Sequence, residues 1–272
     1  MADEIHTSIP TTLEQRIRLL WSQIRAFAVH FYTASGAVLA FLIVLAAIRG
    51  DIIQALWIML VAMIIDATDG WLARRFHVSE VLPWFDGRRL DDIVDYLTYA
   101  FAPMLLLWSS GYLPAGLSGL ILTALPLLAS GYQFCRTDAK TSDYFFLGFP
   151  SYWNVVAFYI FVFKIPSLTV GVILLICSLL AFVPIRYLYP SRTIQFRLLT
   201  LLLTGLWLLS YALILQQMPT PQRLLLDYLL VYPLYYVGIS LYLTFQSYYL
   251  AHKTERTRMS DLPEKHREGS VY

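Results

Sequence analysis

Charged residues are scarce in this sequence. They make up 14% of its 272 residues, while hydrophobic residues make up 58%. Soluble domains carry roughly 25% charged residues, and a soluble fold cannot bury this much apolar surface. A lipid bilayer can take the place of water around such a chain. The composition therefore excludes an ordinary soluble domain and predicts an all-α integral membrane protein.

Cysteine is also rare, and repeats are lacking. Cys135 and Cys177 lie far apart in a pattern that suggests no pairing, so we expect neither a disulfide framework nor a cysteine metal site. No internal repeat or low-complexity linker divides the chain. The net charge of +2 says little about partners, and we expect no nucleic acid among them.

Long apolar segments fill most of the sequence. Each is close to the ~20 residues that a helix needs to cross a bilayer. We predict about eight spans, at residues 30–48, 52–73, 91–110, 114–134, 149–165, 168–185, 198–216 and 224–246. They lie within a single predicted membrane domain, 29–250, which a polar cytoplasmic tail follows at 251–272.

The N-terminal segment has a different character. Residues 1–12 are polar, and we expect them to be disordered. In residues 13–28, apolar side chains recur at helical spacing with arginines among them. A short soluble helix would show the same pattern. Because a span follows at once, we favour an amphipathic helix lying on the membrane surface.

Basic residues test this map of spans. With eight spans and the N-terminus inside, all of the 20 Lys and Arg residues except Arg49, Lys164 and Arg223 fall on the cytoplasmic side. Such asymmetry is what the positive-inside rule predicts, and an odd number of spans would destroy it. We therefore expect both termini and the connection at 74–90 to be cytoplasmic.

Aspartates cluster at one boundary of the predicted spans. Asp66 and Asp69 end the second span, and Asp91, Asp92 and Asp95 begin the third. Carboxylates at membrane depth are unfavourable and by default suggest function. Helical spacing puts Asp66 and Asp69 on one face and Asp91 and Asp95 on another, with Asp92 pointing away. Two neighbouring antiparallel spans could therefore point four carboxylates at one another.

Four carboxylates in a poorly hydrated site would repel and raise one another's pKa. One or two divalent cations would resolve this, and hard oxygen ligands suit Mg²⁺, Mn²⁺ or Ca²⁺. Gly70, Ala73 and Gly87 lie on the same faces and leave room for a large ligand, while Arg74 could neutralise phosphate oxygens. The alternative is a set of helix-end aspartates that simply face water.

The two acidic segments together form a longer pattern. It runs Asp66-Ala67-Thr68-Asp69-Gly70-Trp71-Leu72-Ala73-Arg74 and then Gly87-Arg88-Arg89-Leu90-Asp91-Asp92-Ile93-Val94-Asp95. This pattern resembles the signature of the CDP-alcohol phosphatidyltransferases at every fixed position. The sequence departs from most members in the twelve residues between Arg74 and Gly87. The longer spacer, with the stretches 30–36, 81–84 and 140–154, is similar to the bacterial phosphatidylcholine synthases.

This resemblance implies a metal-dependent transfer in a bacterial inner membrane. It implies CDP-diacylglycerol as donor, CMP as leaving group, and a two-metal site with Mn²⁺ or Mg²⁺. Metal ligands would be Asp66, Asp69, Asp91 and Asp95. The donor would contact Asp66, Gly70, Ala73, Arg74 and Gly87. Catalytic roles would fall to Asp91 and to Asp95, our candidate for the general base.

The branch implies choline as the acceptor. Aromatic faces, aided by carboxylates, recognise a quaternary ammonium, and we expect Asp143, Tyr144, Trp153 and Asn154 to contact it. An interfacial aromatic belt would put similar side chains there. A phosphorylated acceptor is not excluded, because its phosphate could be bound by the basic residues Arg136, Lys140, Arg186 and Arg192.

Other readings of the chain remain. Serine, inositol phosphate and glycerol phosphate are alternative acceptors for the same chemistry. A cation transporter is a more distant alternative, but transporters usually bind their ions near the midplane, whereas these aspartates lie at the boundary. The sequence does not determine the oligomeric state, and a homodimer is compatible with it.

Overall fold

The computed structural model describes residues 12–260, and within them the chain is mostly helical. The predicted N-terminal disorder therefore lies outside the described residues apart from Thr12, as does the tail from 261 onward. Two compact units are formed. The first holds Met1–Gly119 and Trp153–Ser167, and the second holds Leu120–Tyr152 and Leu168–Tyr272. Each is described by itself.

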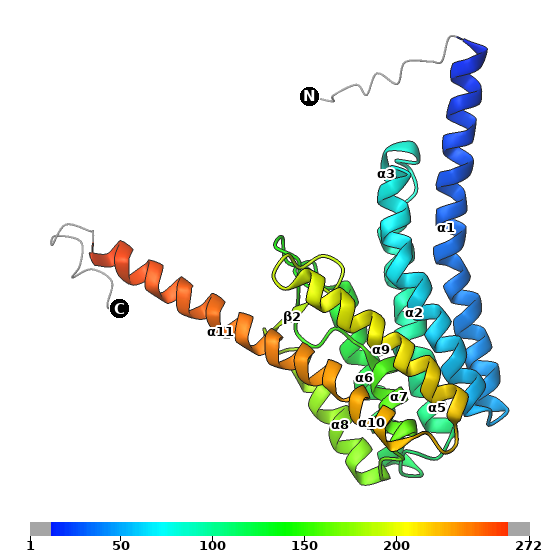
Figure 1. The fold of residues 1–272 in the computed structure, drawn as a ribbon, viewed down its shortest axis with the longest axis vertical. Coiled ribbons are helices and arrows are strands. Elements are labelled where there is room, and N and C mark those ends of the chain that lie inside the picture. Colours follow the sequence, from blue (N-terminus) through cyan, green and yellow to red (C-terminus); the bar gives the residue numbers. More distant parts are fainter. Residues whose placement is uncertain (1–11, 261–272) are drawn as a thin grey trace. The chain divides into compact units, whose positions relative to one another are not determined.

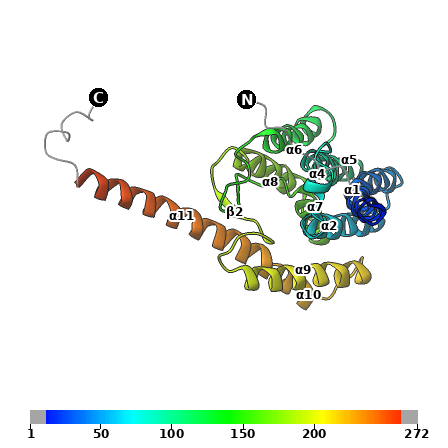
Figure 2. The same ribbon diagram turned by 90° about the horizontal axis from the view of Figure 1, so that it is seen from above.

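Helices account for most of both units, as Figures 1 and 2 show. The first unit contains α1 (Leu13–Ile48), α2 (Ile52–Arg75), α3 (Val78–Val81), α4 (Gly87–Asp95), the π-helix η1 (Tyr96–Phe101), α5 (Ala102–Ser109) and α7 (Trp153–Val162). The second contains most of α6 (Leu117–Cys135) and nearly all of α8 (Ser167–Leu180), with β1 (Phe145–Leu147), β2 (Arg186–Leu188), α9 (Arg197–Gln217), α10 (Arg223–Leu229) and α11 (Val231–Ser260).

Among residues 12–260, five helical stretches are long and apolar enough to cross a membrane: Leu13–Ile48, Ile52–Arg75, Leu117–Cys135, Arg197–Gln217 and Arg223–Leu250. These stretches agree with an all-α membrane protein. The expected third span, 91–110, is divided among α4, η1 and α5. The expected fifth and sixth spans correspond to the shorter apolar helices α7 and α8.

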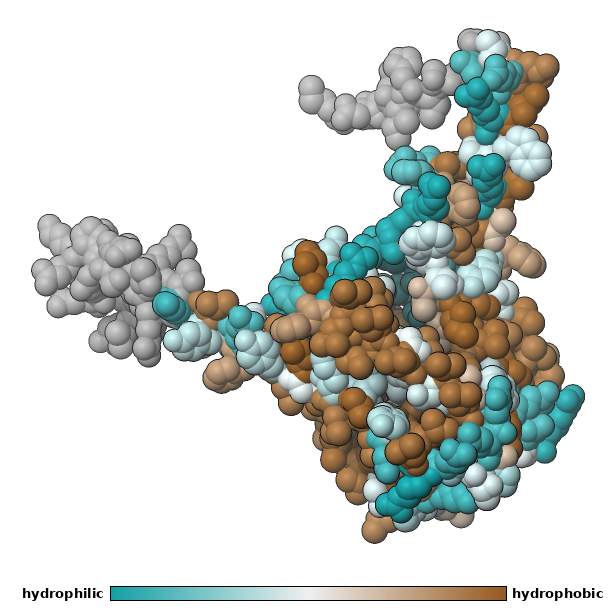
Figure 3. Space-filling model, in the orientation of Figure 1, coloured by the Kyte–Doolittle hydropathy of each residue, from teal (hydrophilic) through white to brown (hydrophobic). Residues whose placement is uncertain are grey.

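Helix α1 is longer than any single predicted segment. It joins the expected surface helix and the first span without a break, because residues 25–33 contain neither Pro nor Gly to interrupt it. A capping box between Thr12 and Gln15 starts it. Its 36 residues span about 54 Å, more than the ~30 Å hydrocarbon core. Its N-terminal part extends past α2 and α3 and has hydrophilic and hydrophobic sides (Figures 1 and 3).

Two neighbouring hydrogen bonds fix the register of α1 against α2. The Tyr32 hydroxyl lies 2.9 Å from Thr68 Oγ1, and Thr33 Oγ1 donates to Asp69 Oδ2 at 2.8 Å. Interhelical hydrogen bonds of this kind stabilise membrane helix pairs. Because the two bonds lie one residue apart on both helices, they determine both the height and the rotation of α1 on α2.

Two glycines allow α4 to approach α1 closely. A Cβ on Gly36 of α1 would lie 2.5 Å from Val94 Cγ1, and one on Gly87 of α4 would lie 2.6 Å from His30 Cε1. Neither distance is possible for a real side chain without movement. Since position 30 meets 87 and position 36 meets 94, the two helices run parallel. Helix α1 therefore contacts both of the helices that carry the aspartates.

The helix that begins with α4 changes its winding after Asp95. Tyr96–Phe101 forms a π-helix before α-helical winding resumes in α5, where Pro103 is an early residue. A proline ring clashes with the carbonyl four residues earlier in a regular α-helix, and here that residue is Tyr99. The wider π-turn accommodates Pro103 and at the same time changes the direction of the side chains that follow Asp95.

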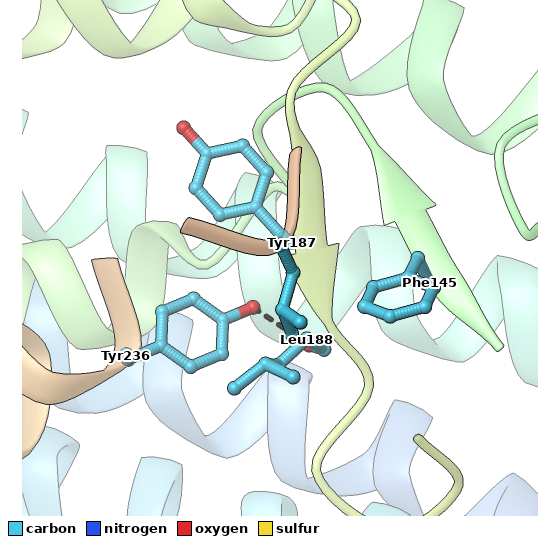
Figure 4. Packing of buried hydrophobic residues seen from close by; sticks show 5 residues of the cluster. Phe145, Tyr187, Leu188 and Tyr236 are labelled. Carbon is cyan, nitrogen blue, oxygen red and sulfur yellow. Dashed lines mark hydrogen bonds between the residues drawn. The ribbon is translucent and has the colours of Figure 1, made fainter. Parts of the chain in front are cut away.

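The second unit contains a short antiparallel ribbon that the sequence analysis did not predict. Phe145 pairs with Leu188, and Leu147 pairs with Arg186. Side chains of α11 satisfy the other edge of β2: Arg186 N donates to Thr244 Oγ1 at 2.8 Å, Leu188 N donates to Ser240, and Tyr236 donates to the Leu188 carbonyl. Figure 4 shows the last of these bonds and the aromatic packing around it. Such pairing matters in a membrane protein because lipid, unlike water, offers no hydrogen-bond partner to an open strand edge.

Candidate metal centre

Three of the predicted aspartates meet between α2 and α4. Asp66, Asp91 and Asp95 each offer a carboxylate oxygen, and these oxygens lie within 4.8 Å of one another. All three side chains are partly buried. Asp66 lies in the second half of α2, while Asp91 and Asp95 are separated by one turn of α4. The i, i+4 spacing on α4 therefore turns both carboxylates toward α2.

Asp69 lines the same small pocket but has a different environment. The pocket is bounded by the four aspartates together with Thr33, Gly36, Val94 and Thr98. Asp69 is only 6% exposed and accepts the hydrogen bond from Thr33. It does not belong to the group of three whose oxygens converge. Asp92 lies outside the pocket lining, which agrees with its predicted direction away from the shared face.

Electrostatics decide what this arrangement can hold. Two ionised carboxylates 4.8 Å apart repel by about 3 kcal/mol at an effective dielectric constant of ~20. Summed over three pairs, the repulsion would match the entire stability of many domains. A bound divalent cation would offset this repulsion. Two oxygens on opposite sides of one Mg²⁺ lie about 4 Å apart, so a shared divalent cation fits this donor set.

Two residues without an acidic group touch the aspartates. Besides the bond from Thr33 to Asp69, the Tyr99 hydroxyl donates to Asp66 Oδ2 at 2.6 Å. Neither residue was predicted from the sequence to have a role. A signal was nevertheless present, because Thr33 is a polar residue inside an apolar span. Tyr99 also continues the stripe of Asp91 and Asp95 by another four residues.

The predicted donor-binding residues fall into two groups. A Cβ on Gly70 would meet only the terminal Nη1 of Arg74, at 3.2 Å, so packing does not require a glycine there. Arg74 is exposed and lies over Gly70. Gly87, in contrast, is needed for contact with His30, and Ala73 packs against the apolar cluster that includes Leu82. Packing therefore explains the small residues at positions 73 and 87, whereas space for a ligand would explain the glycine at position 70.

Of the predicted acceptor residues, Asp143 lies in the second unit and already has polar partners. It accepts a hydrogen bond from Thr141 at 2.7 Å and pairs with Arg186. Partial burial opposes ionisation, but the hydrogen bonds from Thr141 and Arg186 and the charge of Arg186 lower the pKa of Asp143. The carboxylate is therefore ionised at neutral pH and held by an arginine of the same chain.

The other acceptor candidates differ in accessibility. The Tyr144 ring has the Arg192 guanidinium 5.3 Å from its centroid, an arrangement typical of a cation–π contact. Trp153 and Asn154, at the start of α7, are 0% and 1% exposed, and the Asn154 side chain accepts a hydrogen bond from Val155 N. These two belong to the first unit, so neither unit contains all four candidates.

Comparisons with known proteins agree with this site. The family model described as CDP-alcohol phosphatidyltransferase matches residues 30–216. A phosphatidylcholine synthase of Legionella pneumophila is 39% identical over 240 residues, which cover 85% of this chain and 92% of the relative. The phosphatidylcholine synthase of Borreliella burgdorferi is 34% identical over 85% of this chain and 96% of its own. That of Pseudomonas aeruginosa is 36% identical over 80% and 91%.

The match covers α2 and α4 with all the aspartates of the pocket. The relatives also share most of their length with this chain, so the similarity is not confined to the motif. The chain therefore belongs to the CDP-alcohol phosphatidyltransferase family and is a membrane-embedded phosphatidyltransferase.

Proposed function

We propose that this enzyme is a phosphatidylcholine synthase, which condenses CDP-diacylglycerol with choline to give phosphatidylcholine and CMP. The observation that carries the proposal is the convergence of Asp66, Asp91 and Asp95 between α2 and α4. Relatives named phosphatidylcholine synthase support the choice of product. We further propose that the enzyme lies in a bacterial inner membrane with both termini and the site facing the cytoplasm, as the distribution of Lys and Arg indicates.

The mechanism follows from the carboxylates. Asp66, Asp91 and Asp95 would bind Mn²⁺ or Mg²⁺, with Asp69 beside them as a further ligand in a two-metal site. Bound there, the cations would neutralise the donor's pyrophosphate and polarise its phosphorus. Asp95 would accept the proton of the choline hydroxyl. The choline oxygen forms a bond to the phosphorus that carries diacylglycerol, the bond from that phosphorus to the CMP oxygen breaks, and CMP leaves.

Donor binding would use the open surface of α2. Gly70 lacks a side chain where packing would permit one, so its role is best explained by a nucleotide that approaches the backbone. Arg74, lying over Gly70, can reach a phosphate of that ligand. Asp66 would contact the donor through the cations. Ala73 and Gly87 would act indirectly, since both take part in packing against other residues of the first unit.

Acceptor binding is the less determined half of the reaction. Asp143 and Tyr144 have the chemistry to bind a quaternary ammonium, a carboxylate and an aromatic face. Each now holds an arginine of the same unit, so choline would have to exchange with it. Trp153 and Asn154 would contribute only from the buried end of α7. We therefore base the choice of choline on the relatives and treat these four residues as candidates to be tested.

The function is tested directly by supplying acceptors to the purified enzyme. With CDP-diacylglycerol and Mn²⁺, we expect CMP release and lipid product with choline, and little with serine, inositol phosphate or glycerol phosphate. Chelation by EDTA should abolish the reaction, and added Mn²⁺ or Mg²⁺ should restore it. Preference for another alcohol would overturn the acceptor but not the chemistry. Full activity after exhaustive chelation would overturn the metal site.

A matched pair of neighbouring aspartates tests which helix face is active. Asp91→Asn removes an oxygen from the converging group and should lower the rate of CMP release by at least ~10³-fold. Asp92→Asn changes a side chain outside the pocket, so we expect a loss below about tenfold. Both variants should insert and purify normally. Equal losses in kcat would show that the proposed face of α4 is wrong.

A pair of glycines separates ligand space from packing space. Gly70→Ala should keep or slightly raise thermal stability, because alanine is favoured over glycine in a helix by ~1 kcal/mol, yet it should raise the KM for CDP-diacylglycerol. Gly87→Ala should lower the melting temperature, since overpacking typically destabilises by about 1–3 kcal/mol. Thermal unfolding and donor kinetics of both purified variants provide the comparison. A Gly70→Ala enzyme with unchanged donor kinetics would argue against nucleotide binding at this position.

A further inference from the structure

Two hydroxyl groups from outside the aspartate motif are placed to hold its carboxylates. We propose that Tyr99 and Thr33 are positioning residues that fix the orientation of Asp66 and Asp69 for the divalent cations. The inference rests on the metal site proposed above. It concerns residues that act through the carboxylates they contact.

The Tyr99 bond is short and sheltered. Its hydroxyl donates to Asp66 Oδ2 at 2.6 Å, the range of charge-assisted O–H···O⁻ bonds. The tyrosine is only 8% exposed, so water competes little for the bond. The ring comes from η1 and the carboxylate from α2. The bond therefore connects the two helices that must bring their aspartates together.

The π-helix explains how Tyr99 reaches Asp66. In a regular α-helix, each step of four residues overshoots a full turn by about 40°, so a stripe of Asp91, Asp95 and Tyr99 would drift away from α2. A π-turn takes in one more residue per turn and reduces this drift where it follows Asp95. π-Bulges are frequent at functional sites. Pro103, four residues after Tyr99, gives a local reason for this winding.

Thr33 acts in the same way from a third helix. Its hydroxyl donates to Asp69 Oδ2 at 2.8 Å, and the two side chains are 7% and 6% exposed. The neighbouring Tyr32–Thr68 bond joins the same two helices but involves no carboxylate. The two adjacent bonds thus differ in whether they involve a carboxylate, and this difference allows a controlled experiment. Loss of either weakens the attachment of α1 to α2, but only loss of the Thr33 bond releases an aspartate.

Fixed carboxylates should bind cations more tightly than rotating ones. A hydrogen bond to one oxygen restricts rotation about the side-chain bond, so the carboxylate would be held in one orientation for a cation. Loss of such outer partners typically lowers metal affinity or activity by 10–100-fold. We therefore expect Tyr99→Phe and Thr33→Val to weaken Mn²⁺ binding by about this factor. Tyr99→Phe removes only the hydroxyl group, and Thr33→Val replaces the hydroxyl group with a methyl group of similar size.

The test is a Mn²⁺ titration of the full-length protein in detergent with saturating CMP, with free Mn²⁺ measured by electron paramagnetic resonance. The variants are Tyr99→Phe and Thr33→Val, with Thr33→Ser as the variant that retains the hydroxyl and Tyr32→Phe as the control for helix attachment. We expect Tyr99→Phe and Thr33→Val to raise the Kd for Mn²⁺. Thr33→Ser and Tyr32→Phe should both keep the Kd near the wild-type value. CMP release should recover at high Mn²⁺ in the weakened variants.

The outcomes separate this inference from the function on which it rests. If the wild-type protein binds no Mn²⁺, or if Asp91→Asn binds it unchanged, the proposed metal site fails. If the wild type binds Mn²⁺ and Asp91→Asn does not, while Tyr99→Phe and Thr33→Val bind normally, only the positioning role is overturned. A loss in Tyr32→Phe as large as in Thr33→Val would also overturn it, because helix attachment would then explain the effect.

Discussion

The mutual repulsion of Asp66, Asp91 and Asp95 is the constraint on which the first unit depends. Carboxylate oxygens within 4.8 Å of one another would drive α2 and α4 apart unless other contacts held the helices in place. Helix α1 provides those contacts. Thr33 binds Asp69 directly, and Gly36 lets Val94 approach without a side chain between them. The candidate metal centre is thus built on two helices and held together by a third.

The local winding of the helix after Asp95 also affects the aspartate cluster. Pro103 is unfavourable four residues after Tyr99 in regular α-helical geometry, and the residue that donates to Asp66 lies in the π-helix that precedes this proline. A backbone irregularity is therefore coupled to the orientation of a carboxylate. In the second unit, the ribbon of β1 and β2 depends in a similar way on hydroxyl groups of α11, which take the place of a further strand.

The sequence predicted what depends on local spacing. Asp91 and Asp95 share a face because four residues make about one helical turn, and no long-range information is needed to place them on it. The role of α1 could not be predicted in this way, since the closeness of Gly36 to Val94 depends on tertiary packing. The pairing of Asp143 with Arg186 is equally hidden, because 43 residues separate the partners. The predicted surface helix and the first predicted span form one continuous helix, because no Pro or Gly lies between them at residues 25–33.

We propose that the aspartates of α2 and α4 hold the divalent cation that acts on the donor. An experimental structure with Mn²⁺ and a cytidine nucleotide, measured at a wavelength where manganese scatters anomalously, tests it most directly. We expect an anomalous peak between Asp66, Asp91 and Asp95, within coordination distance of their oxygens, with the nucleotide phosphate beside it. A bound nucleotide whose manganese lies elsewhere, or that binds without manganese at these carboxylates, would contradict it.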